Sequence, residues 1–286
     1  MDLFFRDFGG AGKPPLVVLH GLLGSSRNWR TAGGDLAASH HVLAPDLRNH
    51  GRSPRADGMG YDAMVGDVLG WLDARGLRRV SLLGHSMGGK VAMALACCHA
   101  ERVSRLVVVD IAPRDYPPAH QAEFAAMNAL DLRSLRSRAE AEARFEARVG
   151  DWAMRKFLAT NLERVPETAP ENEPRTRGGG ACAGGAGIAC AVPSVARWRW
   201  AVNLPVLTAA LPELGRNPLR EGERFDGEVL LLAGAKSDYV GPGDWAAVTG
   251  HFPRARLEVV AGAGHNPHIE RRAEFARLAG GFLAGA

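Results

Sequence analysis

A serine in a glycine-rich turn is the residue of this chain best placed for nucleophilic chemistry. Ser86 lies in Gly84-His85-Ser86-Met87-Gly88, which follows the apolar run Val80 to Leu83 and precedes a segment with helical spacing. Strand, tight turn and helix in succession is the context in which a G-x-S-x-G motif exposes its serine hydroxyl as a nucleophile. Glycine is needed on both sides because the backbone there passes too close to its neighbours for a side chain. The motif therefore predicts that Ser86 is a nucleophile.

A serine hydroxyl needs a base within hydrogen-bond reach, and the base needs a carboxylate that orients it. Among the ten histidines, His265 follows the last apolar run and precedes the final helical segment. We expect it to be the base, since a strand-end loop can direct it back over the sheet. His50, in an earlier strand-end loop, is a weaker alternative. We expect His20 and His85 to make local hydrogen bonds in turns, and His268 to begin a helix.

The acid has two candidates, Asp110 and Asp238, each at or beyond the end of an apolar run. In folds with such a serine turn, the acid usually lies three residues past the glycine that ends the later strand. Counting from Gly234 reaches Ser237, which is not a carboxylate. Both aspartates could reach the distal nitrogen of His265. We prefer Asp110 and keep Asp238 as the alternative.

An oxyanion hole needs two backbone N–H groups directed at the developing negative charge. We expect one from Met87, at the start of the helix after Ser86, where the helix dipole assists. The other is expected from Leu22, which follows His20-Gly21 at the end of an early strand. Asp46 and Arg48 are interpreted as a structural ion pair within a turn.

The pattern of the elements predicts how these residues are positioned. Continuous apolar runs of this kind are typical of strands buried on both faces of a parallel sheet. Their alternation with helical segments predicts an α/β fold with a mostly parallel, doubly wound sheet. Ligands bind such sheets beyond the carboxyl ends of the strands, where every motif above falls. The strands are expected at residues 3–8, 16–19, 42–44, 80–83, 106–109, 229–233 and 256–260.

The alternation stops in the middle of the chain. We therefore predict a core of residues 1–113 and 226–286, interrupted by a lid or cap insertion over residues 114–225. The insertion shows no clear strand; helices are expected at 121–128, 139–149 and 152–161, and in part over 197–211. Residues 166–195 are rich in proline, glycine and alanine with few large apolar side chains, which predicts a disordered loop.

Composition restricts the class of protein. The 286 residues carry a net charge of +4 without a basic run interleaved with aromatics, so we expect no nucleic-acid partner. Neither a signal peptide nor a membrane-spanning run is evident, and a cytoplasmic location is expected. Of the four cysteines, Cys97 and Cys98 are expected to be buried thiols, and Cys182 and Cys190 complete no metal-ligand spacing. No metal and no cofactor are predicted.

Four motifs, LHGLLGS, PDLRNHGRSP, LLGHSMGGKVAM and VVVDIAP, occur in this order. With them the chain resembles the α/β-hydrolase superfamily, in particular small bacterial esterases related to mammalian abhydrolase-domain protein eleven. FLATNL, WRWAVNL and FPRARLEVVAGAGH extend the resemblance over most of the chain. It implies hydrolysis of short acyl esters or thioesters without a cofactor, with Ser86 as nucleophile, His265 as base and Asp110, at the VDIAP position, as acid. Residues 166–195 have no expected counterpart.

The function predicted is therefore a serine hydrolase of the carboxylesterase or acyl-thioesterase type, acting on a small-molecule ester or thioester through an acyl-enzyme. Two alternatives stay open. One is a C–C bond hydrolase or cofactor-free haloperoxidase-like enzyme on the same fold. The other is a non-catalytic ligand-binding homologue, against which the presence of all three candidate triad residues argues. No oligomeric state is predicted.

Overall fold

A seven-stranded sheet forms the centre of the protein, with strand order β1-β3-β2-β4-β5-β8-β9. The computed structural model describes residues 1–117, 119–166 and 196–285. Strand β1 pairs antiparallel with β3 at the sheet edge, and all other neighbouring strands are parallel, as predicted. The strands are β1 (Phe5–Asp7), β2 (Pro15–Leu19), β3 (His41–Pro45), β4 (Val80–His85), β5 (Val103–Val109), β8 (Glu228–Gly234) and β9 (Ala255–Val260).

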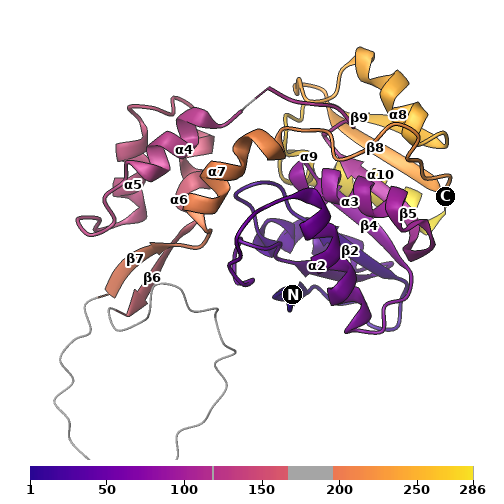
Figure 1. Ribbon diagram of the computed structural model, residues 1–286, viewed down its shortest axis with the longest axis horizontal. Coiled ribbons are helices and arrows are strands. Elements are labelled where there is room, and N and C mark those ends of the chain that lie inside the picture. The colour runs from indigo at the N-terminus through magenta and orange to yellow at the C-terminus, as the bar shows by residue number, and fades with distance from the viewer. Residues whose placement is uncertain (118, 167–195, 286) are drawn as a thin grey trace, which may run out of the picture.

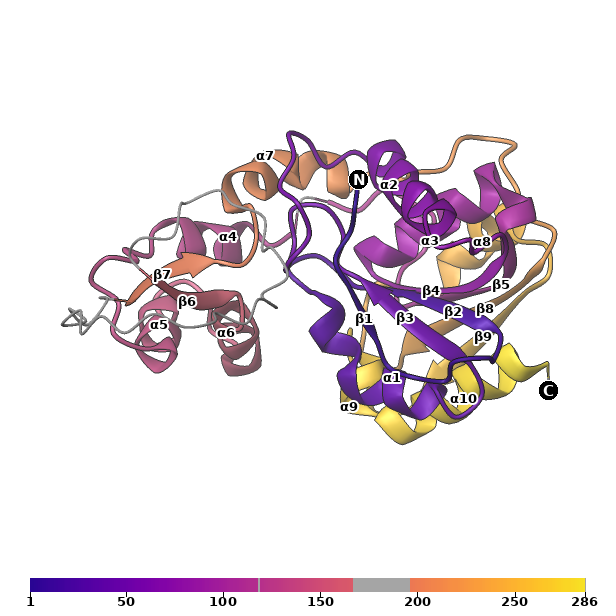
Figure 2. The ribbon, with the colours of Figure 1, turned by 90° about the horizontal axis from the view of Figure 1, so that it is seen from below.

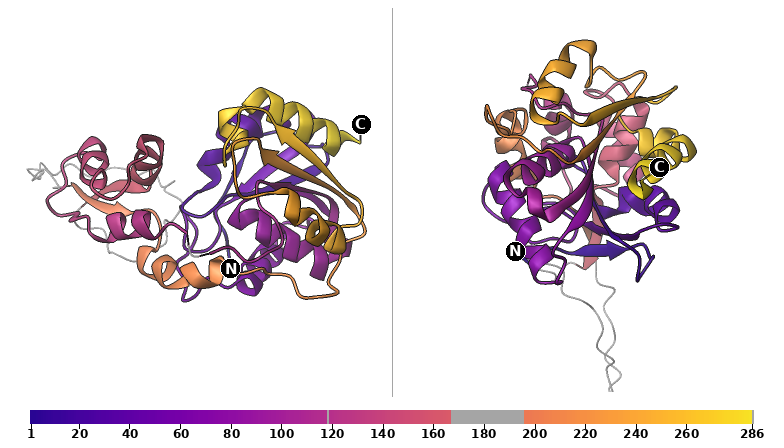
Figure 3. Two further views of the ribbon diagram at one scale, coloured as in Figure 1. Left: turned by 90° about the horizontal axis from the view of Figure 1, so that it is seen from above. Right: turned by 90° about the vertical axis from the view of Figure 1, so that its right-hand side faces the viewer.

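Helices cover both faces of this sheet (Figure 2 and Figure 3). One layer holds α2 (Tyr61–Asp73), α3 (Met87–Cys98) and α8 (Trp245–His251); the other holds α1 (Arg30–Leu36), α9 (Pro267–Glu270) and α10 (Arg272–Ala284). Short 3-10 turns, η1 (Ser26–Trp29), η2 (Ala100–Arg102) and η3 (Pro242–Asp244), join some of them. Within β2, Val17 and Leu19 join one buried cluster while Leu16 and Val18 join the other. Because successive side chains point to opposite faces, burial on both produces the continuous apolar runs of the sequence.

The chain reverses its direction of winding at β2. From β2 it proceeds to β3 on one side, then crosses back to β4 on the other side. Such a switch point opens a crevice beyond the carboxyl ends of the two flanking strands. The loop after β2 and the turn after β4 therefore meet there.

The lid lies to one side of the core in Figure 1. It comprises α4 (Gln121–Asn128), α5 (Arg138–Phe145), α6 (Trp152–Ala159), β6 (Leu162–Pro166), β7 (Ala196–Trp200) and α7 (Leu204–Leu214). The expectation that the insertion shows no clear strand is wrong for β6 and β7. The helix expected in part over 197–211 is α7, which begins at Leu204. These strands pair antiparallel from Leu162 opposite Trp200 to Pro166 opposite Ala196. The residues between them, 167–195, lie outside the described part of the chain, as does the predicted disorder there.

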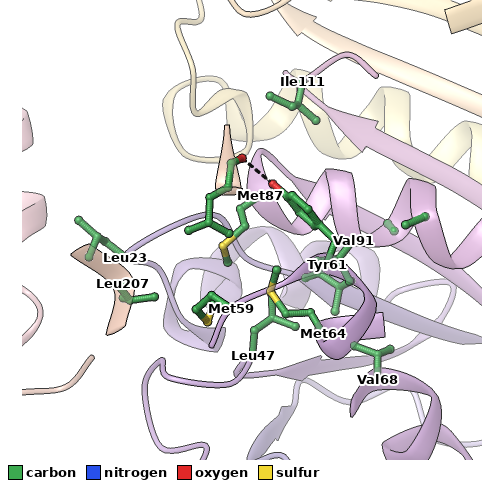
Figure 4. Close-up of a cluster of buried hydrophobic side chains, with 14 of the residues drawn as sticks. Leu23, Leu47, Met59, Tyr61, Met64, Val68, Met87, Val91, Ile111 and Leu207 are labelled. Carbon is green, nitrogen blue, oxygen red and sulfur yellow. Dashed lines mark hydrogen bonds between the residues drawn. The ribbon is translucent and has the colours of Figure 1, made fainter. Parts of the chain in front are cut away.

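Hydrogen bonds fasten the lid to the core loops around the crevice. The Asn203 N–H donates to the Asn49 carbonyl oxygen over 2.8 Å, and Asn161 Nδ2 donates to the Leu23 carbonyl oxygen over 3.0 Å. At the other end of α7, the Tyr61 hydroxyl donates to the Leu214 carbonyl oxygen over 2.7 Å (Figure 4). The lid is thus braced against the loops that follow β2 and β3 and against α2.

The two adjacent cysteines of α3 differ in burial. Cys97 is half-buried, but Cys98 is exposed, so the prediction of two buried thiols is wrong for the second. Adjacent residues of a helix point about 100° apart, so only one of them faces the core fully.

Over the described residues, no helix is both long and apolar enough to cross a membrane.

Candidate active site

Ser86 sits on a strained turn between β4 and α3. Its backbone has φ 52° and ψ −119°, a conformation that residues with a side chain rarely adopt. A Cβ atom at Gly84 would lie 2.2 Å from the Gly88 carbonyl oxygen, and one at Gly88 would lie 2.5 Å from the His20 carbonyl oxygen. Glycine is therefore the only residue that fits at either place. The turn has the shape predicted for a nucleophile elbow.

The loop after β2 passes directly over this turn. A Cβ atom at Gly21 would lie 3.3 Å from the Ser86 Cβ atom, so the loop backbone approaches the serine closely. Leu22 and Met87 line the same pocket as Ser86. Within the described residues, no protein acceptor takes a hydrogen bond from either N–H group. Both are thus available to a ligand atom above Ser86, and Met87 begins α3, whose dipole favours negative charge.

Two buried histidines hold that loop in place. The His20 Nε2 atom accepts a hydrogen bond from the Leu47 N–H over 2.9 Å, and His50 Nε2 accepts one from the Leu23 N–H over 3.2 Å. Burial lowers the pKa of His20 to about 4 and that of His50 to about 3, so both rings are neutral near pH 7. His50 Nδ1 bonds the Arg48 carbonyl oxygen. With both ring nitrogens engaged by backbone, His50 orders the loop and has no free nitrogen for Ser86.

Asp110 and His265 come together at the end of β5. The His265 Nδ1 atom lies 2.7 Å from Asp110 Oδ2, and the Gly234 N–H donates to Oδ1 over 2.8 Å. Asp110 is fully buried and has φ 52°, so its side chain turns from the strand toward the histidine. Because a carboxylate only accepts hydrogen bonds, Nδ1 carries the ring proton. The Nε2 atom of His265 is then left unprotonated, as a general base requires.

The alternative acid lies elsewhere. Asp238 is exposed, and among the described residues it makes neither a hydrogen bond nor an ion pair. Ser237, which occupies the position where the sequence pattern leads one to look for the acid, donates its hydroxyl proton to Asp110 Oδ2. The structure therefore brings Asp110 and Ser237 to His265, and does not bring Asp238.

Three further residues at this site were not assigned to it by sequence reasoning. The Tyr239 ring stacks on the His265 ring, with centroids 3.9 Å apart and planes inclined by 22°. His85 does not bond locally as predicted: its Nε2 atom donates to the His265 carbonyl oxygen over 2.8 Å. Burial holds the pKa of His85 well below its usual value, with the neighbouring His265 and His268 adding to the effect. Lys90 lines the pocket of Ser86. No spacing rule marks such contacts, since they join residues far apart in the chain.

Asp46 and Arg48 do not form the ion pair that was predicted. Asp46 instead accepts hydrogen bonds from the N–H groups of Ser26, over 2.6 Å, and Arg52, over 2.8 Å. Arg48 Nε bonds Asp67 Oδ2 in α2 over 2.6 Å. The two side chains point to different neighbours because the turn closes around Asp46 while α2 packs beside Arg48.

The pocket above Ser86 is small, with a volume of about 60 Å³. Its walls come from Leu22, Met87, Ile111, Tyr116, Leu214 and Tyr239. Within the described residues, no group of three or more histidine, cysteine, aspartate or glutamate side chains is arranged to hold a metal ion. Besides Ser86, the polar side chains of Tyr61, Lys90 and His120 line the pocket.

A strained serine at a strand-to-helix turn, two unbonded backbone N–H groups beside it and a histidine–aspartate pair beyond define the class. Residues 14–272 match the model of the alpha/beta hydrolase fold family, and the chain belongs to that family.

The relatives are esterases and lipases. The chain is 32% identical to esterase YbfF of Escherichia coli, over 90% of this chain and 88% of the relative. It is 34% identical to the sn-1-specific diacylglycerol lipase ABHD11 of Mus musculus, over 96% of this chain and 83% of the relative. Among solved structures, a marine microorganism esterase superposes with a TM-score of 0.84 at 29% identity, covering 98% of each chain. The protein is an α/β hydrolase of the esterase type.

Proposed function

We propose that this protein hydrolyses short-chain carboxylic esters and acyl thioesters through an acyl-enzyme formed on Ser86. The observation that carries the proposal is the 2.7 Å contact between His265 Nδ1 and Asp110 Oδ2, which leaves the other ring nitrogen free as a base. Ser86 is then the nucleophile, His265 the base and Asp110 the acid that orients it.

In the first half of the reaction, Ser86 Oγ attacks the substrate carbonyl carbon while its proton passes to His265 Nε2. The carbonyl oxygen becomes an oxyanion, to which Leu22 and Met87 donate their N–H groups. Each such donor is worth about 3–4 kcal/mol of barrier. The imidazolium, stabilised by Asp110, then gives its proton to the departing alcohol or thiol, and the acyl group stays on Ser86.

In the second half, water takes the place of the alcohol. His265 removes a proton from the water as its oxygen attacks the acyl carbon, the oxyanion forms again, and the proton then passes to Ser86 Oγ as that bond breaks. The products are the carboxylic acid and the free serine. The chemistry proposed needs no group other than the residues of this chain and water.

The size of the pocket supports short acyl groups. Its volume of about 60 Å³ is far below the 300 Å³ or more of typical ligand pockets. Aromatic and aliphatic walls favour an apolar acyl chain. Thioesters share the acyl half of an ester, so the same pocket accepts both.

Replacement of the nucleophile tests the proposal. Ser86→Ala should lower kcat for p-nitrophenyl acetate and butyrate by at least about 10⁴-fold, because loss of the serine removes the acyl-enzyme route. A fluorophosphonate probe should add its mass to the wild type and not to Ser86→Ala. Ser39→Ala, at an exposed serine, is the matched control and should keep the wild-type rate.

Retained esterase activity in a folded Ser86→Ala protein would reject Ser86 as nucleophile. A wild-type protein that binds esters but neither turns them over nor reacts with the probe would favour a non-catalytic ligand-binding role.

A further inference from the structure

Lys90 is a buried cation in the wall of the candidate pocket. It lies one helical turn after Ser86 in α3, where its N–H donates to the Ser86 carbonyl oxygen over 3.0 Å. The residue is only 2% exposed, and the described residues provide no carboxylate in ion-pair contact with its ammonium. Burial lowers its pKa to about 8, partly offset by the more distant Asp115. Burying a charge without a counterion is unfavourable, so an apolar residue would suit this place better if packing were its only role.

The ammonium group of Lys90 holds the end of a lid helix. Its Nζ atom donates to the carbonyl oxygens of Gly215, over 2.8 Å, and Arg216, over 2.6 Å, directly after the last residue of α7. A cation at the carboxyl end of a helix satisfies carbonyl groups that have no partner within the helix, and it complements the helix dipole. The ring of Tyr116 lies 4.8 Å from Nζ, which adds a cation–π contact.

Other residues of the pocket wall fasten the same turn. The Tyr116 N–H donates to the Gly215 carbonyl oxygen over 2.8 Å. The Tyr61 hydroxyl donates to the Leu214 carbonyl oxygen. A Cβ atom at Gly215 would lie 2.8 Å from the Tyr116 carbonyl oxygen, so the two segments touch. Leu214, Gly215 and Tyr116 all line the pocket above Ser86. The position of this turn therefore limits how far the pocket extends.

We propose that Lys90 determines the acyl-chain length that the enzyme accepts, by holding the 214–216 turn of the lid against the core and so closing the pocket. Lys90 is thus a specificity-determining residue that acts through the lid and does not touch the reacting atoms. The proposal rests on the ester hydrolysis proposed above.

The region behind the turn suits a longer acyl chain. Met59, Met64 and Met87 pack with Leu23 and Leu207 between α2, α3 and α7 (Figure 4). Methionine side chains are flexible and repack easily around apolar ligands. When the turn is released, α7 can move away from α2 and admit acyl carbons among these residues. With the turn held, the chain must end within the small pocket.

Replacement of Lys90 by methionine tests this role, since methionine keeps the length of the side chain but has neither charge nor donors. Lys13→Met is a matched control. Lys13 Nζ likewise donates to two carbonyl oxygens beyond a helix end, those of Ala37 and Ala38 at 2.9 Å each, but lies at an exposed site after α1. The measurement is kcat/KM for p-nitrophenyl acetate, butyrate, octanoate and decanoate.

The ratio of kcat/KM for octanoate to that for acetate should rise at least about tenfold in Lys90→Met, which is the scale on which pocket size discriminates between acyl chains. It should stay at the wild-type value in Lys13→Met. Tyr61→Phe, which removes the bond to Leu214, should change the ratio in the same direction, and it replaces Lys90→Met if that variant fails to fold.

An unchanged ratio in folded Lys90→Met, or in Tyr61→Phe when that variant replaces it, would overturn the proposal. An equal loss of activity on all four esters would do the same. A wild-type protein that hydrolyses none of them would instead overturn the proposed function, so the two failures are distinguishable.

Discussion

At the scale of single residues, the hydrogen bonds around Asp110 distinguish between the two candidates for the acid of the triad. Asp110 Oδ2 accepts hydrogen bonds from Ser237 and from His265 Nδ1, and Oδ1 accepts one from the Gly234 N–H. Three hydrogen bonds hold such a carboxylate in one orientation. Ser237 lies where the sequence pattern would place the acid itself. Its hydroxyl instead donates a hydrogen bond that orients Asp110.

Asparagine at position 110 tests that role. Asp110→Asn should lower kcat for p-nitrophenyl acetate by about 10³–10⁴-fold, because its amide favours the wrong tautomer of His265 and cannot stabilise the imidazolium. Asp238→Asn is the control of the same chemistry and should stay within about twofold, as expected of an exposed residue without partners. A larger loss in Asp238→Asn than in Asp110→Asn would transfer the role to Asp238.

At the scale of elements, the end of β4 joins the parts of the site. His85 precedes Ser86, donates to the His265 carbonyl oxygen, and presents its Nδ1 atom to the loop after β2. A Cβ atom at Gly21 would lie 2.8 Å from that Nδ1 atom and 3.3 Å from the Ser86 Cβ atom. The segments that follow β2, β4 and β9 are therefore packed so closely that displacement of one moves the others.

Gly21→Ala should show this coupling. We expect kcat for p-nitrophenyl acetate to fall about 10²-fold, since a shift of about 1 Å in catalytic groups has an effect of that size. The comparison is Gly66→Ala in α2, an exposed glycine with open space around its would-be Cβ atom, which should keep the wild-type rate. Wild-type kcat in Gly21→Ala would show that the loop can move without disturbing Ser86.

At the scale of the whole molecule, several histidines are buried as neutral rings. Burial lowers the pKa of His20 to about 4 and that of His50 to about 3. His268 packs on Trp29 with ring centroids 4.4 Å apart; burial, aided by the nearby His265, lowers its pKa to about 3. These residues come from the loops after β2 and β3 and from α9, so their protonation opposes the whole fold.

Acid should therefore destabilise the protein below pH 6.5, the ordinary histidine pKa. The folded-state pKa values are lower, so the unfolded chain binds more protons there, and stability is lost as pH falls from 6.5 toward 4. Each buried histidine contributes a slope of up to about 1.4 kcal/mol per pH unit. Urea unfolding at pH 7.5, 6.5, 5.5 and 4.5 measures the free energy of unfolding.

His268→Phe separates this effect from general acid sensitivity, since phenylalanine keeps the stacking on Trp29 and does not titrate. The slope between pH 6.5 and 4.5 should become shallower by about 1 kcal/mol per unit. His99→Gln removes a partly exposed histidine and should leave the slope as in the wild type. An identical slope in all three proteins would mean that His268 does not titrate differently on folding.

The division into a core of 1–113 and 226–286 with an insertion of 114–225 stays a prediction at this scale. Every strand of the large sheet falls within the first two ranges, between Phe5 and Val260, and the helices α4 to α7 fall within the third. The ties from Lys90 and Tyr61 to the end of α7 lie close to the second boundary.

The sequence by itself determined the strands of the large sheet, their order along the chain and the turn at Ser86. Strands such as β2 and β8 are buried on both faces, and burial of this kind requires apolar residues without interruption, which is visible in one dimension. The elbow was equally visible, because its glycines are required by contacts within a single turn. Family membership followed from such motifs, and the matching family model confirms it.

Only the tertiary structure decided which side chains meet. It directed Asp110 rather than Asp238 to His265, paired Arg48 with Asp67, and joined β6 to β7 across a long separation in the chain. It also placed Lys90 on the end of α7. Each of these contacts depends on the direction of a side chain or strand edge relative to a partner many residues away. Local pattern carries no information about that direction, since it arises from the packing of the whole molecule.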